Sequence, residues 1–193
     1  MSSRYVFTVV YKGRERVRQY GHGNGTPITI IPDIIRFANI PDNLGHLKQN
    51  LQKCKFAHHN HQLISEKLFC EIHNSRPLYT YWKTPDEKMN GFHKAGGFSK
   101  KDIFKYILCD RTVGYCILDV LVRREADKAK SIYLRKARTT EVSRHGYDAS
   151  YVINLDNGYV YCQWKKRKMK FSLSNPPSWE EIKLFEWDDE EEE

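Results

Sequence analysis

Two alternating apolar runs around an Asp-Asn-Gly triplet constrain the fold of this chain more than any other stretch. The runs are residues 151–155 and 159–163, and Asp156, Asn157 and Gly158 separate them. Asn-Gly favours the two positive-φ residues of a type I′ turn, whose twist matches that of paired antiparallel strands. The sequence therefore predicts a β-hairpin with Asn157 and Gly158 in its turn.

Two dense groups of basic residues accompany this hairpin. The first group follows the second run directly and consists of Lys165, Lys166, Arg167, Lys168 and Lys170. The second group lies upstream and consists of Arg123, Arg124, Lys128, Lys130, Arg135, Lys136 and Arg138. Phosphate contacts require such a density of cationic donors, because each neutralised phosphate releases counterions. Both groups are therefore candidate nucleic-acid-binding residues.

The charge of the chain is unevenly distributed. Seven of the 24 acidic residues lie in residues 186–193, so residues 1–185 hold 32 Lys and Arg against 17 acids. The resulting formal charge of about +15 on residues 1–185 attracts polyanions, namely nucleic acid, anionic lipid or an acidic protein. We therefore expect nucleic acid or another polyanion as the partner, with a protein partner as the alternative.

Tyr159 and Tyr161 lie in the hairpin run that precedes the first basic group. Aromatic rings exposed on a sheet stack on unpaired bases, which favours RNA or single-stranded DNA over a duplex. One face of a hairpin packs on the core, so only half of its rings can be exposed. The leading prediction is a non-enzymatic regulatory protein that binds RNA or single-stranded nucleic acid through this basic, aromatic-rich hairpin.

A group of cysteines and histidines offers a candidate zinc site. Thiolate and imidazole are the ligands that tetrahedral zinc prefers. We draw the four ligands as Cys54, His59, Cys70 and His73, with His58 or His61 as substitutes for His59. No Cys-x-x-Cys pair is present, and free cysteine also behaves as a small apolar residue. We therefore expect no cofactor, with zinc as the exception, and the second functional hypothesis is a protein-interaction adaptor stabilised by zinc.

A metal-dependent nuclease is the distant alternative. His59-Asn60-His61 resembles the paired-histidine motif of replication-initiator nucleases, but Asn stands where that motif has a hydrophobic residue. The sequence contains no Gly-x-Ser-x-Gly, Walker or zincin pattern. These observations favour a protein without enzymatic activity.

Several features predict an intracellular protein of the nucleus, the cytoplasm or both. The N-terminus lacks the features of a signal peptide, and no apolar run is long enough to span a membrane. The five cysteines are odd in number and widely spaced, as in a reducing compartment. Residues 165–168 also match a short nuclear-localisation pattern.

The pattern of the remaining chain predicts an α+β fold with a largely antiparallel sheet and three or four short helices. The expected strands are residues 4–11, 15–20, 28–31, 78–83, 113–122 and 132–137, in addition to the hairpin. Three helices are expected to begin at Asp42 or Asn43, at residue 100 and at residue 179. A Ser178–Glu181 capping box supports the last of these. We also expect one or two helical turns from Asp33, and residues 58–73 favour a helix. Residues 1–185 form a single domain in this scheme, and residues 186–193 form a disordered acidic tail.

Overall fold

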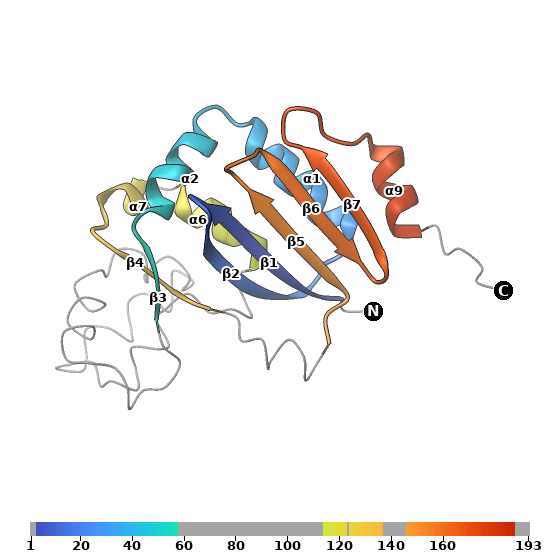
Figure 1. The fold of residues 1–193 in the computed structure, drawn as a ribbon, viewed down its shortest axis with the longest axis horizontal. Helices are drawn as coiled ribbons and strands as arrows, with labels where there is room; N and C mark the ends of the chain where they lie inside the picture. The colour runs from blue at the N-terminus through green and yellow to red at the C-terminus, as the bar shows by residue number, and fades with distance from the viewer. Residues whose placement is uncertain (1–2, 58–113, 123, 137–145, 188–193) are drawn as a thin grey trace, which may run out of the picture.

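The protein has mixed α and β structure built around one five-stranded sheet (Figure 1). The computed structural model describes residues 3–57, 114–122, 124–136 and 146–187. The sheet has the strand order β2-β1-β5-β6-β7, in which only the β1–β5 pair is parallel. Its strands are β1 (Ser3–Tyr11), β2 (Arg14–Gly23), β5 (Ala149–Asn154), β6 (Tyr159–Trp164) and β7 (Arg167–Ser172).

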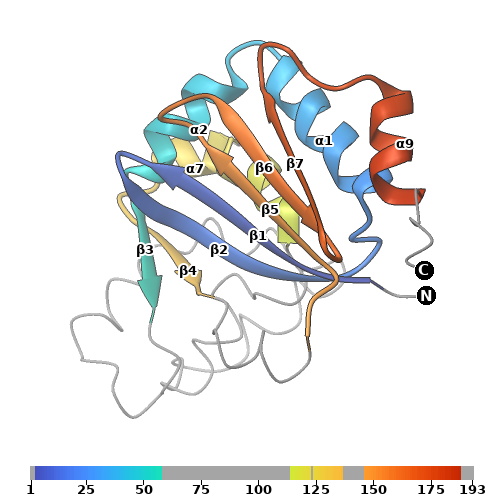
Figure 2. The same cartoon turned by 45° about the vertical axis from the view of Figure 1, so that its right-hand side comes forward.

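Helices cover one face of this sheet, and a second, two-stranded sheet lies beside β2. The helices are α1 (Pro27–Asn39), α2 (Asn43–Leu51), α6 (Ile117–Leu121), α7 (Arg124–Lys128) and α9 (Trp179–Trp187). The small sheet pairs β3 (Cys54–Ala57) with β4 (Ile132–Arg135) in parallel. Figures 1 and 2 show α1 and α6 behind the large sheet, with α9 beside α1. In the described part of the chain, no helix lies over the opposite, outer face.

The core forms between the helices and the inner face of the sheet. Phe7 and Val9 of β1, Tyr151 of β5, and Ile30 and Ile34 of α1 have no or almost no exposed surface. Strand residues alternate between faces, so every second residue of β5 and β6 points into this core. The apolar positions that predicted the strands are therefore the positions that join the sheet to α1.

The hairpin predicted around Asn157 and Gly158 is confirmed, but its turn differs from the prediction. Asn154 pairs with Tyr159, which leaves a four-residue loop between β5 and β6 rather than a two-residue turn. Gly158 has a positive φ of +72°, whereas Asn157 does not. The expected strands 4–11 and 15–20 also form a hairpin, and its two-residue turn has a positive φ at both Lys12 (+55°) and Gly13 (+63°).

The predicted strand at residues 28–31 is wrong, because these residues belong to α1. Their β-branched side chains favour a strand locally, but Ile30, Ile31, Ile34 and Phe37 share a helical face that is buried against the sheet. Pro27 begins the helix, where its missing N–H costs no hydrogen bond. Tertiary packing thus overrides the local preference.

The predicted strand at residues 113–122 is also wrong. The described part of this segment is a 3-10 turn, Gly114–Cys116, followed by α6. Four of the five residues of α6 are buried, so the segment is apolar on nearly all sides. A short apolar run that is buried all round shows no periodicity, and periodicity alone does not separate helix from strand there.

Three further predictions are confirmed in the described residues. The helix from Asn43, the strand from Ile132 and the final helix lie where expected, although α9 extends to Trp187 and so includes the first two residues of the predicted tail. The Ser178–Glu181 capping box is present, since each residue accepts a hydrogen bond from the backbone N–H of the other. The five described α-helices exceed the predicted three or four, and neither β3 nor β7 was predicted. The elements predicted within 58–113 and the tail residues 188–193 lie outside the described residues.

Candidate nucleic-acid interface

The outer face of β6 and β7 carries aromatic and basic side chains side by side. Tyr159 and Tyr161 point outward from β6, while Val160, Cys162 and Trp164 point into the core. Tyr161 pairs with Lys170 of the neighbouring strand. The alternation of inward and outward side chains along β6 therefore leaves Tyr159 and Tyr161 as the two rings on the outer face.

Lys170 lies over both of these rings. Its ammonium nitrogen is 4.2 Å from the ring centroid of Tyr159 and 5.4 Å from that of Tyr161. Such distances allow cation–π attraction. The side-chain amide of Asn157 also donates a 3.2 Å hydrogen bond to the hydroxyl of Tyr161. The two rings are thus held in place by a cation and by the loop of the hairpin.

A shallow hollow of about 250 Å³ lies next to these rings. Val152 and Tyr161 contribute apolar surface to it, and Lys168 and Lys170 contribute positive charge. Ser150 and Gln163 add polar groups that can donate and accept hydrogen bonds. The combination of an apolar floor with cationic and polar groups suits a planar, anionic ligand such as a nucleotide.

The first basic group divides between the β6–β7 turn, strand β7 and a contact with α9. Lys165, which has a φ of +53°, and Lys166 form the exposed turn. Lys168 and Lys170 are exposed on the outer face of β7. Arg167 differs, because its guanidinium donates hydrogen bonds to the backbone carbonyls of Leu184 (3.0 Å) and Phe185 (3.2 Å) in α9. Four of the five predicted residues therefore present charge at this surface, and Arg167 holds a helix end.

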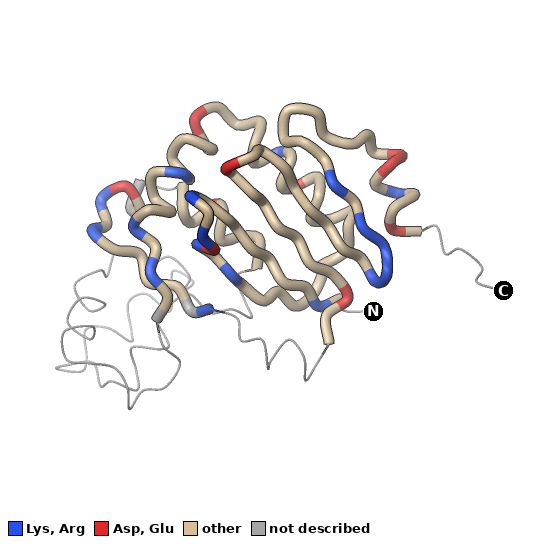
Figure 3. Tube along the Cα trace, in the orientation of Figure 1, with Lys and Arg blue, Asp and Glu red and all other residues tan. Residues whose placement is uncertain are grey.

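The second basic group lies at the other edge of the sheet (Figure 3). Lys128 and Lys130 are exposed at the end of α7 and in the segment after it, next to the small sheet. Lys136 is exposed too, but it forms a 2.7 Å ion pair with Glu15 and lies 5.1 Å from the ring centroid of Phe56. Arg123, Arg138 and the side chains of Arg124 and Arg135 lie outside the described part of the chain. The fold thus separates the described members of the two groups.

Sequence reasoning missed a set of basic residues that surrounds the second group. The β1–β2 turn, β2, α2 and the segment around β3 contribute them at the same edge (Figure 3). They are Lys12, Arg14, Arg16, Arg18, Lys48, Lys53 and Lys55. Arg14, Arg16 and Arg18 stand at every second position of β2, which was a signal for a basic face of this strand. Their joint position depends on the packing of β3 and β4 against β2, which no local pattern indicates.

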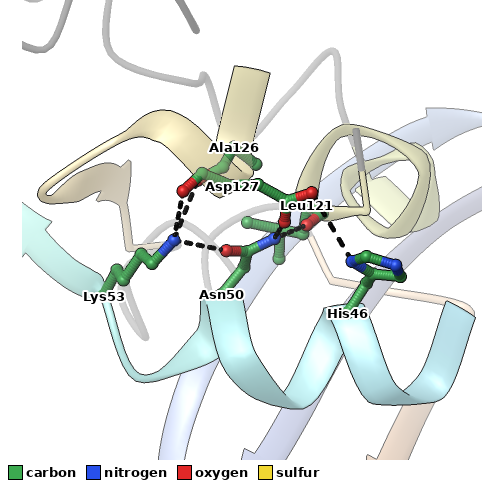
Figure 4. Close-up of polar contacts among 6 residues, drawn as sticks. All are labelled: His46, Asn50, Lys53, Leu121, Ala126 and Asp127. Atoms are coloured by element: carbon green, nitrogen blue, oxygen red, sulfur yellow. Dashed lines mark hydrogen bonds and ion pairs between the residues drawn. The ribbon is translucent and has the colours of Figure 1, made fainter. Parts of the chain in front are cut away.

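A polar network holds α7 at this edge (Figure 4). Lys53 donates hydrogen bonds to the side chain of Asn50 (2.9 Å) and to the backbone carbonyls of Ala126 (3.2 Å) and Asp127 (2.9 Å). The fully buried Asn50 in turn donates to the carboxylate of Asp127 at 2.8 Å. The hydrogen bond from Asn50 is the main cause that lowers the pKa of Asp127. Lys53 therefore serves as a helix-end cap rather than as a ligand-binding cation.

One of the four candidate zinc ligands is described, and it lies in the core. The side chain of Cys54 is buried, and its thiol contacts the carbonyl of Asn50 at 3.5 Å. Burial raises its pKa to about 12, which keeps the thiol protonated. His59, Cys70 and His73 lie outside the described residues, and within the described ranges no three His, Cys, Asp or Glu side chains cluster as metal ligands would.

None of the helices among the described residues has the length and the apolar content needed to cross a membrane. Comparison with family models, with curated proteins and with solved structures found no match.

Proposed function

We propose that this chain is a non-enzymatic regulatory protein that binds RNA or single-stranded nucleic acid on the outer face of β6 and β7. The observation that carries the proposal is the position of Lys170 over Tyr159 and Tyr161, beside a hollow that Lys168 also lines. Lysine ammonium groups would neutralise phosphates, and the tyrosine rings would stack on bases. A base that stacks on Tyr161 would displace the ammonium of Lys170 toward the phosphate backbone.

The second basic group would act as a separate contact. It lies next to β2, and four strand spacings separate β2 from β7, or about 19 Å at ~4.8 Å per spacing. A short oligonucleotide bound along β7 would therefore not reach Lys128 or Lys130. A longer strand would reach both edges, so we expect the salt dependence of binding to become steeper with oligonucleotide length.

The test is a measurement of affinity against salt concentration for single-stranded oligonucleotides. Replacing Lys165, Lys166, Lys168 and Lys170 by Ala is expected to weaken binding and to lower the slope of log K against log salt by about 3, at ~0.7 per lost phosphate contact. The matched control replaces Lys128 and Lys130 by Ala, which removes exposed charge at the other edge. For a short oligonucleotide, an unchanged slope in the first variant, or an equal loss in the control, contradicts the proposal.

Stacking requires a separate arm of the same experiment. Tyr161→Leu removes a ring without changing the charge, so affinity should fall while the salt slope stays the same. Base–aromatic stacking contributes about 1–3 kcal/mol per base, which corresponds to a loss of roughly 5- to 150-fold. Tyr147→Leu is the control, because Tyr147 is also exposed but precedes β5. Equal effects of the two substitutions would argue against stacking on β6.

A protein-interaction adaptor is the second candidate function, and one observation favours it. Leu184 and Trp187 in α9 are 60% and 69% exposed. Exposed tryptophan at a helix surface is typical of protein-binding hot spots.

We also propose a location in the nucleus, the cytoplasm or both. Residues 165–168 match a short nuclear-localisation pattern, and three of them are exposed lysines at or beside a turn.

A further inference from the structure

The end of α9 is fixed beside the basic β6–β7 turn (Figures 1 and 3). Arg167, which follows this turn directly, donates hydrogen bonds to the carbonyls of Leu184 and Phe185. Trp164, which precedes the turn, donates its indole N–H to the carbonyl of Glu186 at 3.3 Å. The two residues that flank Lys165 and Lys166 therefore hold the last turn of the helix.

The opposite side of the same helix end is held by α1. The side-chain carboxylate of Glu186 accepts a 2.8 Å hydrogen bond from the backbone N–H of Ile28 in the first turn of α1. This contact satisfies a helix N–H that has no partner within its own helix. Ile182 and Phe185 are buried in the core. The end of α9 is thus held on both sides, by the strand residues that flank the turn and by α1.

Six consecutive acidic residues follow Trp187. They are Asp188, Asp189, Glu190, Glu191, Glu192 and Glu193. We infer that this acidic tail, residues 188–193, docks on the basic turn and strand formed by Lys165, Lys166 and Lys168. The six acids are complementary in charge to these three exposed lysines, and the tail begins at the anchored helix end beside them.

The length of the tail restricts where it binds. Six extended residues span at most about 20 Å, at ~3.3–3.6 Å per residue. Lys165 and Lys166 adjoin the residues that hold the helix end, and Lys168 lies about 7 Å farther than Lys166 along the strand direction. Lys128 and Lys130 lie beyond the far edge of the sheet, another four strand spacings away. The tail therefore reaches the first basic group and not the second.

Docking of the tail has a consequence for ligand binding. A tethered segment of this length has an effective concentration of about 1 mM at the lysines. Its carboxylates compete there with the phosphates of a nucleic acid, so the tail regulates the site. The docking of the tail is independent of the proposed function, whereas this competition rests on it.

Zero-length carbodiimide cross-linking of the full chain tests the docking without any nucleic acid. The reaction joins a carboxylate to a lysine amine as an amide, with loss of water, and mass spectrometry maps the linked peptides. We expect links from residues 188–193 to Lys165, Lys166 or Lys168, and we expect them to disappear in high salt as the ~10 Å Debye length at 0.1 M shortens to ~3 Å at 1 M. Links that are absent, or that are equally frequent at Lys128 and Lys130, overturn the inference.

Deletion of residues 188–193 tests the competition. If the tail binds the lysines with a dissociation constant of about 0.1 mM, deletion should tighten oligonucleotide binding at low salt about tenfold. The matched control replaces Lys165, Lys166 and Lys168 by Ala, in which the same deletion should change affinity far less. An equal effect of the deletion in both backgrounds overturns the competition. If neither full-length nor truncated protein binds oligonucleotides, the proposed function fails, and the cross-linking map still decides whether the tail docks.

Discussion

Asp156, in the loop between β5 and β6, accepts a 2.8 Å hydrogen bond from the backbone N–H of Gly13, in the turn between β1 and β2. The other carboxylate oxygen accepts a 2.7 Å bond from the N–H of Lys12. Because β1 and β5 are parallel neighbours, their C-terminal ends lie together and bring the two connections into contact. One side chain therefore links the two hairpins that form most of the sheet.

Asp156→Asn is expected to lower the melting temperature at neutral pH, because an amide presents only one oxygen to the two N–H groups. Hydrogen bonds from Gly13 and Lys12 lower the pKa of the Asp156 carboxyl. A group with a lowered folded-state pKa stabilises the protein above its unfolded pKa of about 4, and this contribution is lost as the pH falls through the folded value.

Thermal melts from neutral to acidic pH check this expectation. The difference between wild type and Asp156→Asn should be largest near neutral pH and should shrink as the pH falls below about 4. Glu180→Gln is the control, since Glu180 is an exposed carboxylate paired only with Lys183 within α9 in the described structure. Identical melting curves for wild type and Asp156→Asn would show that the carboxylate does not stabilise the two hairpins.

The sequence was sufficient to predict the hairpins, because alternation of apolar residues is a local property. It also indicated that only half of the hairpin rings would be exposed, and the two rings named from the sequence, Tyr159 and Tyr161, do lie on the outer face. Residues 28–31 were predicted wrongly, since burial of one helical face of α1 outweighs β-branching. The role of Arg167 depends on a helix that packs beside β7, and the separation of the basic groups depends on strand order. Neither relationship has a local signal.

Glycines make room for the ring of Tyr5, a residue that is only 5% exposed. A Cβ placed on Gly21 would overlap this ring, and Gly25 and Gly114 approach it in the same way. We expect Gly21→Ala to lower the free energy of unfolding by about 1–3 kcal/mol, as overpacking of a filled core does. Gly21 does not have a positive φ, so this substitution tests space rather than backbone strain.

Denaturant unfolding of a double-mutant cycle measures this effect. In a Tyr5→Leu background, which lacks the ring, Gly21→Ala should cost much less than in the wild type. Gly45→Ala is the control with the opposite sign, because Gly45 lies in α2 and a Cβ there meets no atom within 4 Å. That substitution should stabilise the protein by up to about 1 kcal/mol. Equal costs of Gly21→Ala in both backgrounds would exclude the contact with Tyr5 as the cause.

We expect that Cys54 does not bind zinc and that zinc does not stabilise the fold through this residue. Burial that raises the pKa of this thiol to about 12 disfavours the thiolate that a metal requires. We therefore expect the purified protein to melt at the same temperature with and without a chelator. Near-stoichiometric zinc, and a lower melting temperature after chelation, would instead support Cys54, His59, Cys70 and His73 as ligands. Cys54→Ala should then lower the zinc content.

Arg167 and Lys168 are adjacent in the sequence but are expected to respond differently to substitution. The guanidinium of Arg167 contacts carbonyls at the C-terminal end of α9, where a positive charge stabilises a helix by about 0.3–1 kcal/mol. Arg167→Ala should therefore lower the free energy of unfolding by about 1 kcal/mol and speed hydrogen exchange in residues 182–187. Lys168→Ala should leave both nearly unchanged, because Lys168 is exposed on the outer face.

Oligonucleotide binding should show the reverse order. Lys168→Ala is expected to lower the salt slope by about 0.7, the value of one phosphate contact with a single strand. Arg167→Ala should change the slope less, since its guanidinium is engaged with α9 rather than directed to the outer face. Arg167→Lys separates charge from geometry, because an ammonium keeps the charge but cannot reproduce the planar arrangement of donors. An equal loss of slope in Arg167→Ala and Lys168→Ala would show that Arg167 leaves the helix end to bind phosphate.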